Sequence, residues 1–579
     1  MISHNNCIHP LKANKYNPSK PVCFLFTCSL VLFFALSFEL KAQQKNIPLS
    51  HDADWLYNFV DNSNSSQQPI HTGLQPVIEN SGKHLLSEYA FRNSLDLSHQ
   101  LDSSYNLPAR SKLLRRKLKE ESLININDTA DRFHLTIDPL FNFQASQGNE
   151  NPTAQNYFTN TRGFIVRADL GKNLSLESSF YENQATFPDY ISAAAEYSKV
   201  VPGQGRWKRF KSNGYDYAMA SGYISYAASS HFNLQLGHGK HFIGDGYHSL
   251  LLSDNAFNYP YLRLTSTFGK IQYTNIYAVF MNVNNGIAVS SAGSEALFQK
   301  KAASFQYLNW NVTKRIQLGL FQGLIWEAAD NKNRQHLDAN YFNPIIFSNA
   351  LVYSLNNTNN VLIGGTLKLK IFKNNYFYAQ YAIDGYDASA GSVFNKQAIQ
   401  GGFKSFNIWG IKNLNCLVEY NQARPYTYAH VDPAQSYSHY DQPLAHPLGA
   451  NFKELTGIIS YRYHDFILKA KALYAKVGTD AIVKNTSSSF YPLTGSVGNS
   501  IFISDLSAIN GINSTDNSQN QGNEITLKNI DLSLAYLVNP ITNMQITGGV
   551  NYISGHSVSP LTFLYIGFKT SLSNIYYDF

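Results

Sequence analysis

The sequence predicts an all-β transmembrane protein: an antiparallel outer-membrane β-barrel of about 18 strands, with a small N-terminal periplasmic helical segment acting as a plug. Apolar and polar residues alternate over most of the chain, short turns alternate with long loops, and the chain ends in an aromatic segment, 574–579. There Phe579, Tyr577 and Ile575 share one face, as in a last strand ending at the membrane boundary. We predict that Phe579 and Tyr577 form the barrel terminal signal.

Residues 1–42 are typical of a secretory signal peptide. Three lysines precede an apolar run, 22–38, and Ala42 offers a small residue at the cleavage site. An uncleaved transmembrane anchor is the alternative. Cys416 is the only one of the four cysteines beyond this segment, so no disulfide can form within the mature chain. We expect the mature protein to lie in the cell outer membrane.

The composition agrees with a barrel. Aromatic residues make up 14% of the chain and charged residues 15%, with a mean hydropathy of -0.26. No stretch after the signal is apolar enough for a spanning helix, and a membrane protein without such helices must be a closed barrel. The formal net charge of +7, part of it from signal lysines, is too weak to argue for nucleic acid, and no nucleic-acid partner is expected.

Residues 43–132 are predicted to form the periplasmic helical plug region. Apolar residues follow a helical period over 54–60, 82–91 and 108–123. The last of these carries a basic side, consisting of Arg110, Arg115, Arg116, Lys117 and Lys119. That side is either a solvated helix face or a contact for a phosphate-rich partner such as lipopolysaccharide or capsule.

From residue 133 to 579 the period becomes two, as expected for the barrel. Leu318, Leu320 and Trp326, for example, alternate with Gln317 and Gly319. Lysines facing lipid would cost about 2–4 kcal/mol each, so the strand lysines are predicted to face the lumen. These are Lys368, Lys370, Lys469 and Lys471. Long irregular stretches follow every short turn, which places the long ones outside the cell and the short ones in the periplasm.

The stretch 420–450, an outer loop by this argument, holds the densest set of binding side chains. We predict a polysaccharide-binding site at Arg424, Tyr426, Tyr428, Tyr437, His439 and Tyr440. Aromatic rings stack on sugar C–H surfaces, while the polar groups bind hydroxyls. The alternative is a loop whose aromatic side chains pack over the barrel mouth. Its histidines and aspartates match no recognised metal motif, so neither a metal nor a cofactor is expected.

No feature predicts an enzyme. The glycines of 237–246 follow a strand, but no helix follows them to bind phosphate, so we expect a tight outer loop that could fold into the barrel mouth. No Gly-x-Ser-x-Gly elbow, His-Glu-x-x-His motif or obvious acid–base pair is present.

Several segments carry a family resemblance. They are Gly237–Gly246, Ser249–Asn255, Tyr341–Pro344, Tyr420–Tyr428, His446–Glu454 and Phe568–Phe579. Together they resemble the Wzi-like capsule-assembly outer-membrane proteins, and most closely the Bacteroidetes branch often labelled gliding-motility protein RemB. The resemblance implies a barrel occluded by a periplasmic helical bundle, which acts as a surface lectin holding capsular polysaccharide. No sugar-contacting residue is carried over.

The sequence therefore predicts a barrel that binds or anchors surface polysaccharide, in capsule assembly, gliding motility or both. One alternative is a porin or gated transport channel with lumenal charges. Another is a structural component of the gliding or surface adhesion machinery without a glycan ligand. The expected partners are surface polysaccharide, outer-membrane lipid, gliding-motility proteins and, during biogenesis, the barrel-assembly machinery.

Overall fold

The computed structural model describes residues 44–51, 70–78, 117–119, 121–128, 130, 132–150, 153–283, 298–328, 338–353, 355, 359–385, 395–479, 498–505, 522–539, 541–555 and 560–579. All of them belong to one compact unit, Lys41–Phe579. The predicted signal peptide and almost all of the three predicted N-terminal helices lie outside the described residues, so they stay predictions.

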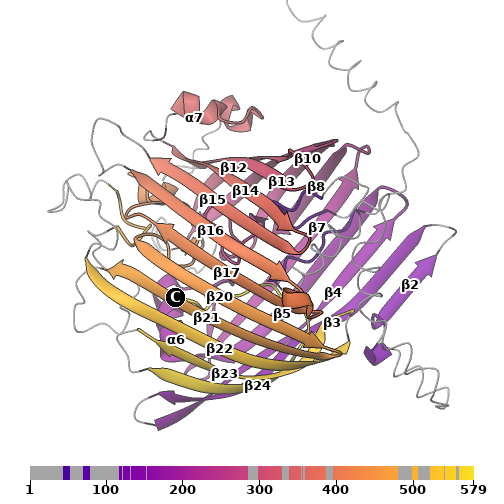
Figure 1. Cartoon of the computed structure of the whole chain (residues 1–579), viewed down its shortest axis with the longest axis vertical. Coiled ribbons are helices and arrows are strands. Elements are labelled where there is room, and N and C mark those ends of the chain that lie inside the picture. The colour runs from indigo at the N-terminus through magenta and orange to yellow at the C-terminus, as the bar shows by residue number, and fades with distance from the viewer. Residues whose placement is uncertain are drawn as a thin grey trace, which may run out of the picture. The chain divides into compact units, whose positions relative to one another are not determined.

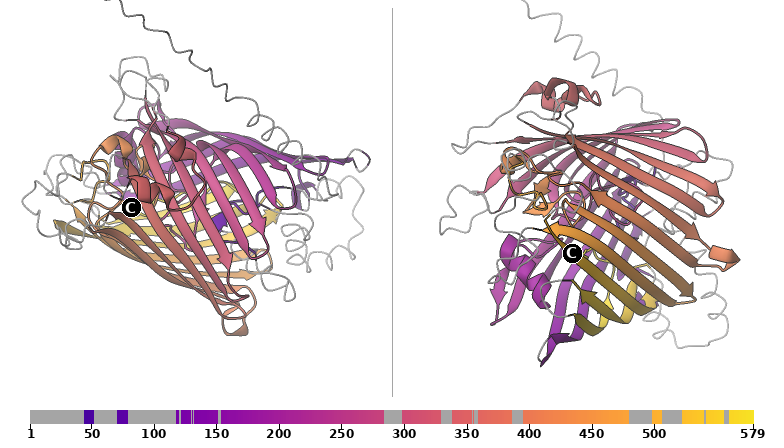
Figure 2. Two further views of the ribbon diagram at one scale, coloured as in Figure 1. Left: turned by 90° about the horizontal axis from the view of Figure 1, so that it is seen from above. Right: turned by 60° about the vertical axis from the view of Figure 1, so that its left-hand side comes forward.

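Eighteen antiparallel strands close into one barrel, seen in Figure 1 and from two further sides in Figure 2. They are β3 (Phe133–Glu150), β4 (Thr153–Leu170), β5 (Leu174–Thr186), β7 (Gly214–Ala227), β8 (Phe232–Gly239), β10 (Tyr259–Phe268), β11 (Ile271–Asn282), β12 (Gln299–Asn311), β13 (Ile316–Glu327), β14 (Asn360–Phe372), β15 (Asn375–Gly385), β16 (Lys396–Phe406), β17 (Leu414–Ala423), β20 (Phe452–Tyr463), β21 (Phe466–Thr479), β22 (Asn523–Asn539), β23 (Met544–Ser554) and β24 (Leu561–Lys569). β24 closes the ring by pairing with β3. The predicted antiparallel outer-membrane barrel of about 18 strands is confirmed, whereas the predicted helical plug lies almost entirely outside the described residues.

Most connections alternate between short and long around the ring, although β3 and β4 are only two residues apart at the end that carries the long loops. Turns such as 171–173, 269–270 and 464–465 join strands at one end, whereas long loops such as 240–258 and 424–451 join them at the other. We assign the end with the short turns to the periplasm, because outer-membrane barrels keep their longer loops outside the cell.

The two faces of each strand differ as predicted. On β13, Leu318 and Leu320 point outward and are exposed, in register with Leu367 and Gly365 of β14. Lys368, which follows Leu367 on β14, points inward, where its Nζ lies 2.9 Å from a carboxylate oxygen of Asp245. The wall is therefore apolar toward lipid, and its charged groups lie in the lumen.

Smaller elements lie beside the wall and within the lumen. They are β1 (Leu74–Gln75), β2 (Ile124–Asp128), α6 (Asp189–Ser198), β6 (Lys208–Phe210), β9 (Phe242–Ile243), η4 (Ala339–Phe342), α7 (Ser348–Tyr353), η6 (Ile408–Gly410), η7 (Pro433–Gln435), β18 (Ser438–His439) and β19 (Gln442–Pro443). β2 pairs with residues 133–137 at the periplasmic end of β3. It lies on the same edge of β3 as β24, which pairs with residues 142–148. None of the helices in the described ranges is long and apolar enough to cross a membrane.

The prediction of a terminal strand over 574–579 is wrong. The last strand, β24, ends at Lys569, and residues 570–579 have no regular secondary structure. Phe579 and Tyr577 therefore do not mark the membrane boundary. The physical reason is that Tyr576 and Asp578 find polar partners deep in the lumen, which a terminal strand in the wall would not offer them.

The assignment of wall faces is tested on β22, where Leu532 faces lipid and Ser533 lines the lumen. We predict that Leu532→Arg lowers the free energy of unfolding in bilayers by about 2–4 kcal/mol, because the guanidinium must enter hydrocarbon. The matched change Ser533→Arg is expected to be close to neutral. Urea titration of both variants in liposomes measures the difference, and equal losses would contradict the assigned faces.

Candidate functional site

Four segments fold into the lumen, and we call them together the plug: 44–51 with 70–78, 240–258, 424–451 and the C-terminal tail 570–579. The first of them lies toward the periplasmic end, where Gln44 N donates to Ser175 Oγ and Gln317 Nε2 donates to Ile70 O, each beside a short turn. The first two meet in a short sheet, where β1 pairs with β9. In Figure 2 these segments lie inside the ring of strands. The plug brings together chain regions that are distant in sequence, so its contacts could not be inferred from spacing alone.

A row of polar side chains on the inner wall holds loop 240–258. Gln380, Gln400, Asn421 and Glu454 lie opposite one another on the adjacent strands β15, β16, β17 and β20. Gln380 Oε1 accepts a hydrogen bond from Leu250 N at 2.8 Å, and Gln400 Nε2 donates to His248 O at 2.8 Å. The row thus satisfies backbone groups of a buried loop that would otherwise lack partners.

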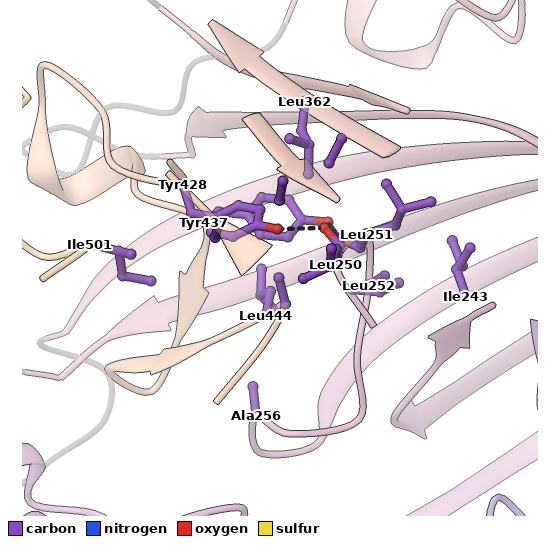
Figure 3. Close-up of a cluster of buried hydrophobic side chains, with 14 of the residues drawn as sticks. Ile243, Leu250, Leu251, Leu252, Ala256, Leu362, Tyr428, Tyr437, Leu444 and Ile501 are labelled. Atoms are coloured by element: carbon purple, nitrogen blue, oxygen red, sulfur yellow. Dashed lines mark hydrogen bonds between the residues drawn. The ribbon is translucent and has the colours of Figure 1, made fainter. Parts of the chain in front are cut away.

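Loop 424–451 packs against loop 240–258 through two tyrosines. Tyr428 Oη donates to Leu250 O at 2.8 Å, and Tyr437 Oη donates to Leu251 O at 2.6 Å, as the dashed lines in Figure 3 show. The two rings are stacked with their centroids 5.8 Å apart. Aromatic bulk and hydroxyl groups together bind the two loops into one buried core.

The predicted polysaccharide-binding residues belong to this core. Tyr426, Tyr428, Tyr437, His439 and Tyr440 are all buried, with at most 5% of their surface exposed, and Arg424 is half-buried. The structure does bring them together, but it buries them instead of presenting them at an outer surface, as in the alternative of a loop whose aromatic side chains pack over the barrel mouth. The loop is long enough to fold inward, and its aromatic rings gain more by burial in the lumen than by exposure at the rim.

His439 shows how tightly the plug is specified. Its Nδ1 accepts from Met281 N at 3.1 Å, and its Nε2 donates to Asn258 O at 3.1 Å. This arrangement fixes the neutral tautomer with hydrogen on Nε2. Burial, together with the nearby positive charge of Lys301, lowers the pKa of His439 to about 3. The imidazole therefore links β11 to the plug only in its neutral form.

The most polar part of the plug lies around two buried glutamates. Glu419 accepts hydrogen bonds from the backbone N–H groups of Tyr247 and His248, at 2.7 and 3.0 Å. Glu454 Oε1 accepts from His248 Nδ1 at 2.9 Å. Burial opposes a charge on His248, but the Glu454 carboxylate outweighs it and raises the pKa of His248. Each carboxylate charge is thereby compensated within the barrel.

Among the described residues, His248, His446 and Glu454 have metal-ligand spacing. Their hydrogen bonds do not suit a metal. His446 Nδ1 accepts from Leu448 N at 3.2 Å, so the hydrogen of the neutral ring lies on Nε2, which is 3.2 Å from Glu454 Oε1. A metal bound at Nε2 would require hydrogen on Nδ1, facing the Leu448 N–H. The geometry favours two histidines that donate to one carboxylate.

The C-terminal tail is fastened to the same cluster. Asp578 Oδ2 accepts from Tyr247 Oη at 2.7 Å, and Asp578 also forms an ion pair with Lys471 of β21. Tyr576 Oη donates to Asp254 Oδ1 at 2.7 Å. Phe579 packs edge-on against Tyr190 of α6, with ring centroids 6.0 Å apart. The tail therefore joins the barrel wall, loop 240–258 and an outer-loop helix.

Beneath the plug, the periplasmic half of the lumen holds a cavity of about 1300 Å³. The plug residues His51 and Tyr247 line it from above, and the turn residues Lys373 and His464 line its periplasmic end. Its charged lining is mainly basic, with Arg167, Lys373, Lys404, Lys412, Arg462, Lys469, Lys471 and Lys569 against Asp138, Asp531 and Asp578. The predicted lumenal positions of Lys469 and Lys471 are confirmed.

The inner-wall row and the tail contacts were not found from the sequence. Gln380, Gln400, Asn421 and Glu454 look like ordinary lumenal residues there, and only the strand register shows that they form one row. Two inward acidic residues on adjacent strands, Glu419 and Glu454, were the available signal, since uncompensated carboxylates are rarely buried.

A closed barrel of 18 antiparallel strands with an apolar outer wall defines the class of outer-membrane barrel proteins. No protein-family model matches the chain, and no curated protein matches it. Among solved structures it is similar to Wzi of Escherichia coli, described as a carbohydrate-binding β-barrel involved in group 1 capsule assembly. The TM-score is 0.50 at 14% identity, over 91% of this chain and 100% of that one.

Two further barrels are similar at a lower level. OprD of Pseudomonas aeruginosa has a TM-score of 0.38 at 10% identity, covering 77% of this chain and 95% of that one. OccAB2 of Acinetobacter baumannii has a TM-score of 0.39 at 11% identity, covering 76% and 98%. The likeness to Wzi confirms the predicted fold. The closed barrel with its apolar outer wall agrees with the predicted location in the outer membrane.

The neutral state of His439 makes the plug sensitive to acid. A histidine whose pKa is lower in the folded than in the unfolded protein stabilises the fold above the unfolded pKa of about 6.5 and loses that contribution as the pH falls toward 3. We predict that the thermal unfolding midpoint falls between pH 7 and pH 4.5, and falls less in His439→Gln. Identical pH dependence in the two proteins would contradict this role.

Proposed function

We propose that this protein binds surface polysaccharide at the outer end of an occluded outer-membrane barrel. The observation that carries the proposal is the plug, in which two outer loops and both ends of the described chain fold into the lumen. A barrel built for diffusion keeps an aqueous path, whereas a filled barrel is suited to hold a ligand at its surface. The carbohydrate-binding activity described for the similar barrel Wzi supports the proposal.

The outer loop between β5 and β7 offers a surface of suitable chemistry. Arg209 lies over the rings of Trp207 and Tyr215, with its guanidinium carbon 4.9 and 5.4 Å from the ring centroids. Arg209 also pairs with Glu196 at 2.6 Å, and both side chains are well exposed. Arginine binds carboxylates in a bidentate manner, so this cluster favours a polysaccharide with acidic sugars.

Trp207 is held in place for such contacts. Its Nε1 donates to Ala195 O at 2.8 Å, which ties strand β6 to helix α6 and presents the ring beside Arg209. Tyr428 and Tyr437 of loop 424–451 belong to the same buried cluster as Phe579 of the tail, and Phe579 packs against Tyr190 of α6. We propose that these loop tyrosines shape the binding surface without touching the sugar.

Binding of purified acidic polysaccharide to the barrel in nanodiscs tests the proposal. We predict that Trp207→Ala and Arg209→Ala each weaken binding about tenfold, as expected for the loss of about 1.4 kcal/mol of contact energy. Trp409→Ala is the matched control, because Trp409 is a highly exposed tryptophan at the periplasmic end. Absence of binding by the unmodified barrel would refute the function, and equal binding by all three variants would refute the site.

The proposal extends to the cellular role, which is capsule attachment, gliding motility or both. A strain lacking the protein is expected to release polysaccharide into the medium, and a strain carrying Arg209→Ala is expected to share this defect. If the deletion strain retained its polysaccharide but stopped gliding, a structural role in the gliding machinery would replace the proposed one.

The channel alternative rests on the basic lumenal cavity and requires the plug to move.

A further inference from the structure

One part of the outer wall breaks the rule that lipid-facing residues are apolar. On β12 and β13 the side chains of Ser304, Gln306 and Gln322 point outward, on the same faces as the exposed Leu318 and Leu320. All three polar side chains are nevertheless buried, at 1% exposure or less. Something on the outside of the barrel covers them.

The cover is the segment 338–353, which includes η4 and α7 and which we call the outer strap. Figure 1 and Figure 2 show α7 outside the ring of strands. Tyr341 of the strap stacks on Trp326 of β13, with ring centroids 4.3 Å apart. Ala350 packs into the same cluster, together with the outward-facing Leu324 and Val361. The strap therefore lies against the wall face that would otherwise meet lipid.

The outward polar side chains bind the backbone of the strap. Gln306 Nε2 donates to Asn343 O at 2.5 Å, and Gln322 Oε1 accepts from Ala350 N at 3.3 Å. Tyr277 Oη of β11 donates to Phe342 O at 3.2 Å. Tyr273 Oη of the same strand donates to Pro344 O. Four backbone groups of the strap are thus hydrogen-bonded to side chains of the wall. Helix geometry supplies no hydrogen-bond partner for these groups.

This pattern is the one required of irregular backbone at membrane depth. In hydrocarbon an unpaired backbone N–H or C=O costs several kcal/mol, so a non-helical segment is tolerated only where protein groups satisfy it. Gln306 and Gln322 lie near the middle of β12 (Gln299–Asn311) and β13 (Ile316–Glu327), not at their outer ends. A loop confined to the aqueous outer surface would need none of these partners.

The other side of the strap is apolar and open. Leu351 is 86% exposed and Ile345 is 66% exposed, and Phe342 lies half exposed between them and the wall. The lipid-facing aliphatic residues Leu318 and Leu320 continue this surface along β13. The outer face of the strap and the wall therefore form one continuous apolar surface.

We propose that the outer strap is an intramembrane segment whose exposed face, with Phe342, Ile345 and Leu351, contacts lipid acyl chains of the outer leaflet. Its partner is a hydrocarbon chain, and the polar row of β11–β13 exists to hold its backbone in that environment. The strap widens the lipid-contacting circumference of the barrel on one side. This inference is independent of polysaccharide binding.

Fluorescence quenching in proteoliposomes tests the strap position. In a Cys416→Ser background, a bimane label is placed at Leu351→Cys, with Leu320→Cys as the wall control and Val431→Cys as the control in the outer loop. We expect brominated acyl chains to quench the labels at 351 and 320 but not at 431, and iodide to do the reverse. Quenching at 351 by iodide alone would overturn the proposal.

A second outcome would also overturn it. If neither quencher reached the label at 351, and Leu351→Cys formed disulfide-linked dimers in the membrane, the surface would be an interface between two copies of the chain. A second variant tests the hydrogen bonds. Gln306→Leu makes the wall more apolar, yet it is expected to release the strap and to make the label at 351 accessible to iodide. Unchanged quenching in Gln306→Leu would show that the wall partners do not hold the strap.

Discussion

The structure depends on one constraint, the pairing of every backbone polar group that lies in hydrocarbon. The barrel meets it by closure, because β24 pairs with β3 and leaves no free sheet edge in the ring. Where other backbone approaches the wall, side chains take over this pairing: Gln380 and Gln400 inside the barrel, Gln306 and Gln322 outside. Polar side chains of the wall are thus docking points for the segments that cover either face.

The plug follows from a related constraint on charge, because a buried carboxylate needs hydrogen-bond donors or a counter-ion. Glu419 and Glu454 could not remain ionised in a dry lumen without donors, and loop 240–258 supplies them through backbone N–H groups and His248. Asp578 then brings the tail to this cluster, with Lys471 as its counter-ion. Segments from three parts of the chain consequently depend on one set of buried charges, which explains why folded segments rather than water surround these charges.

The sequence was sufficient for the wall and insufficient for its contents. Alternation such as that around Leu318 and Leu320 predicted the faces of the strands and their number correctly, because lipid imposes the same pattern on each of them. Phe579 and the tyrosines of loop 424–451 were misplaced. Their aromatic character suits a membrane boundary, a sugar or a packed interior equally well, and only the fold shows that partners such as Leu250 and Tyr190 lie nearby.

The central claim is that the lumen is occluded, and single-channel recording in planar bilayers tests it most directly. The account predicts little steady conductance for the complete protein, and a large stable pore when residues 426–448 are replaced by a short glycine–serine linker. Because Tyr428 and Tyr437 hold both lumenal loops together, their removal opens the outer half of the barrel. Steady large currents through the complete protein, equal to those of the deletion variant, would contradict the account.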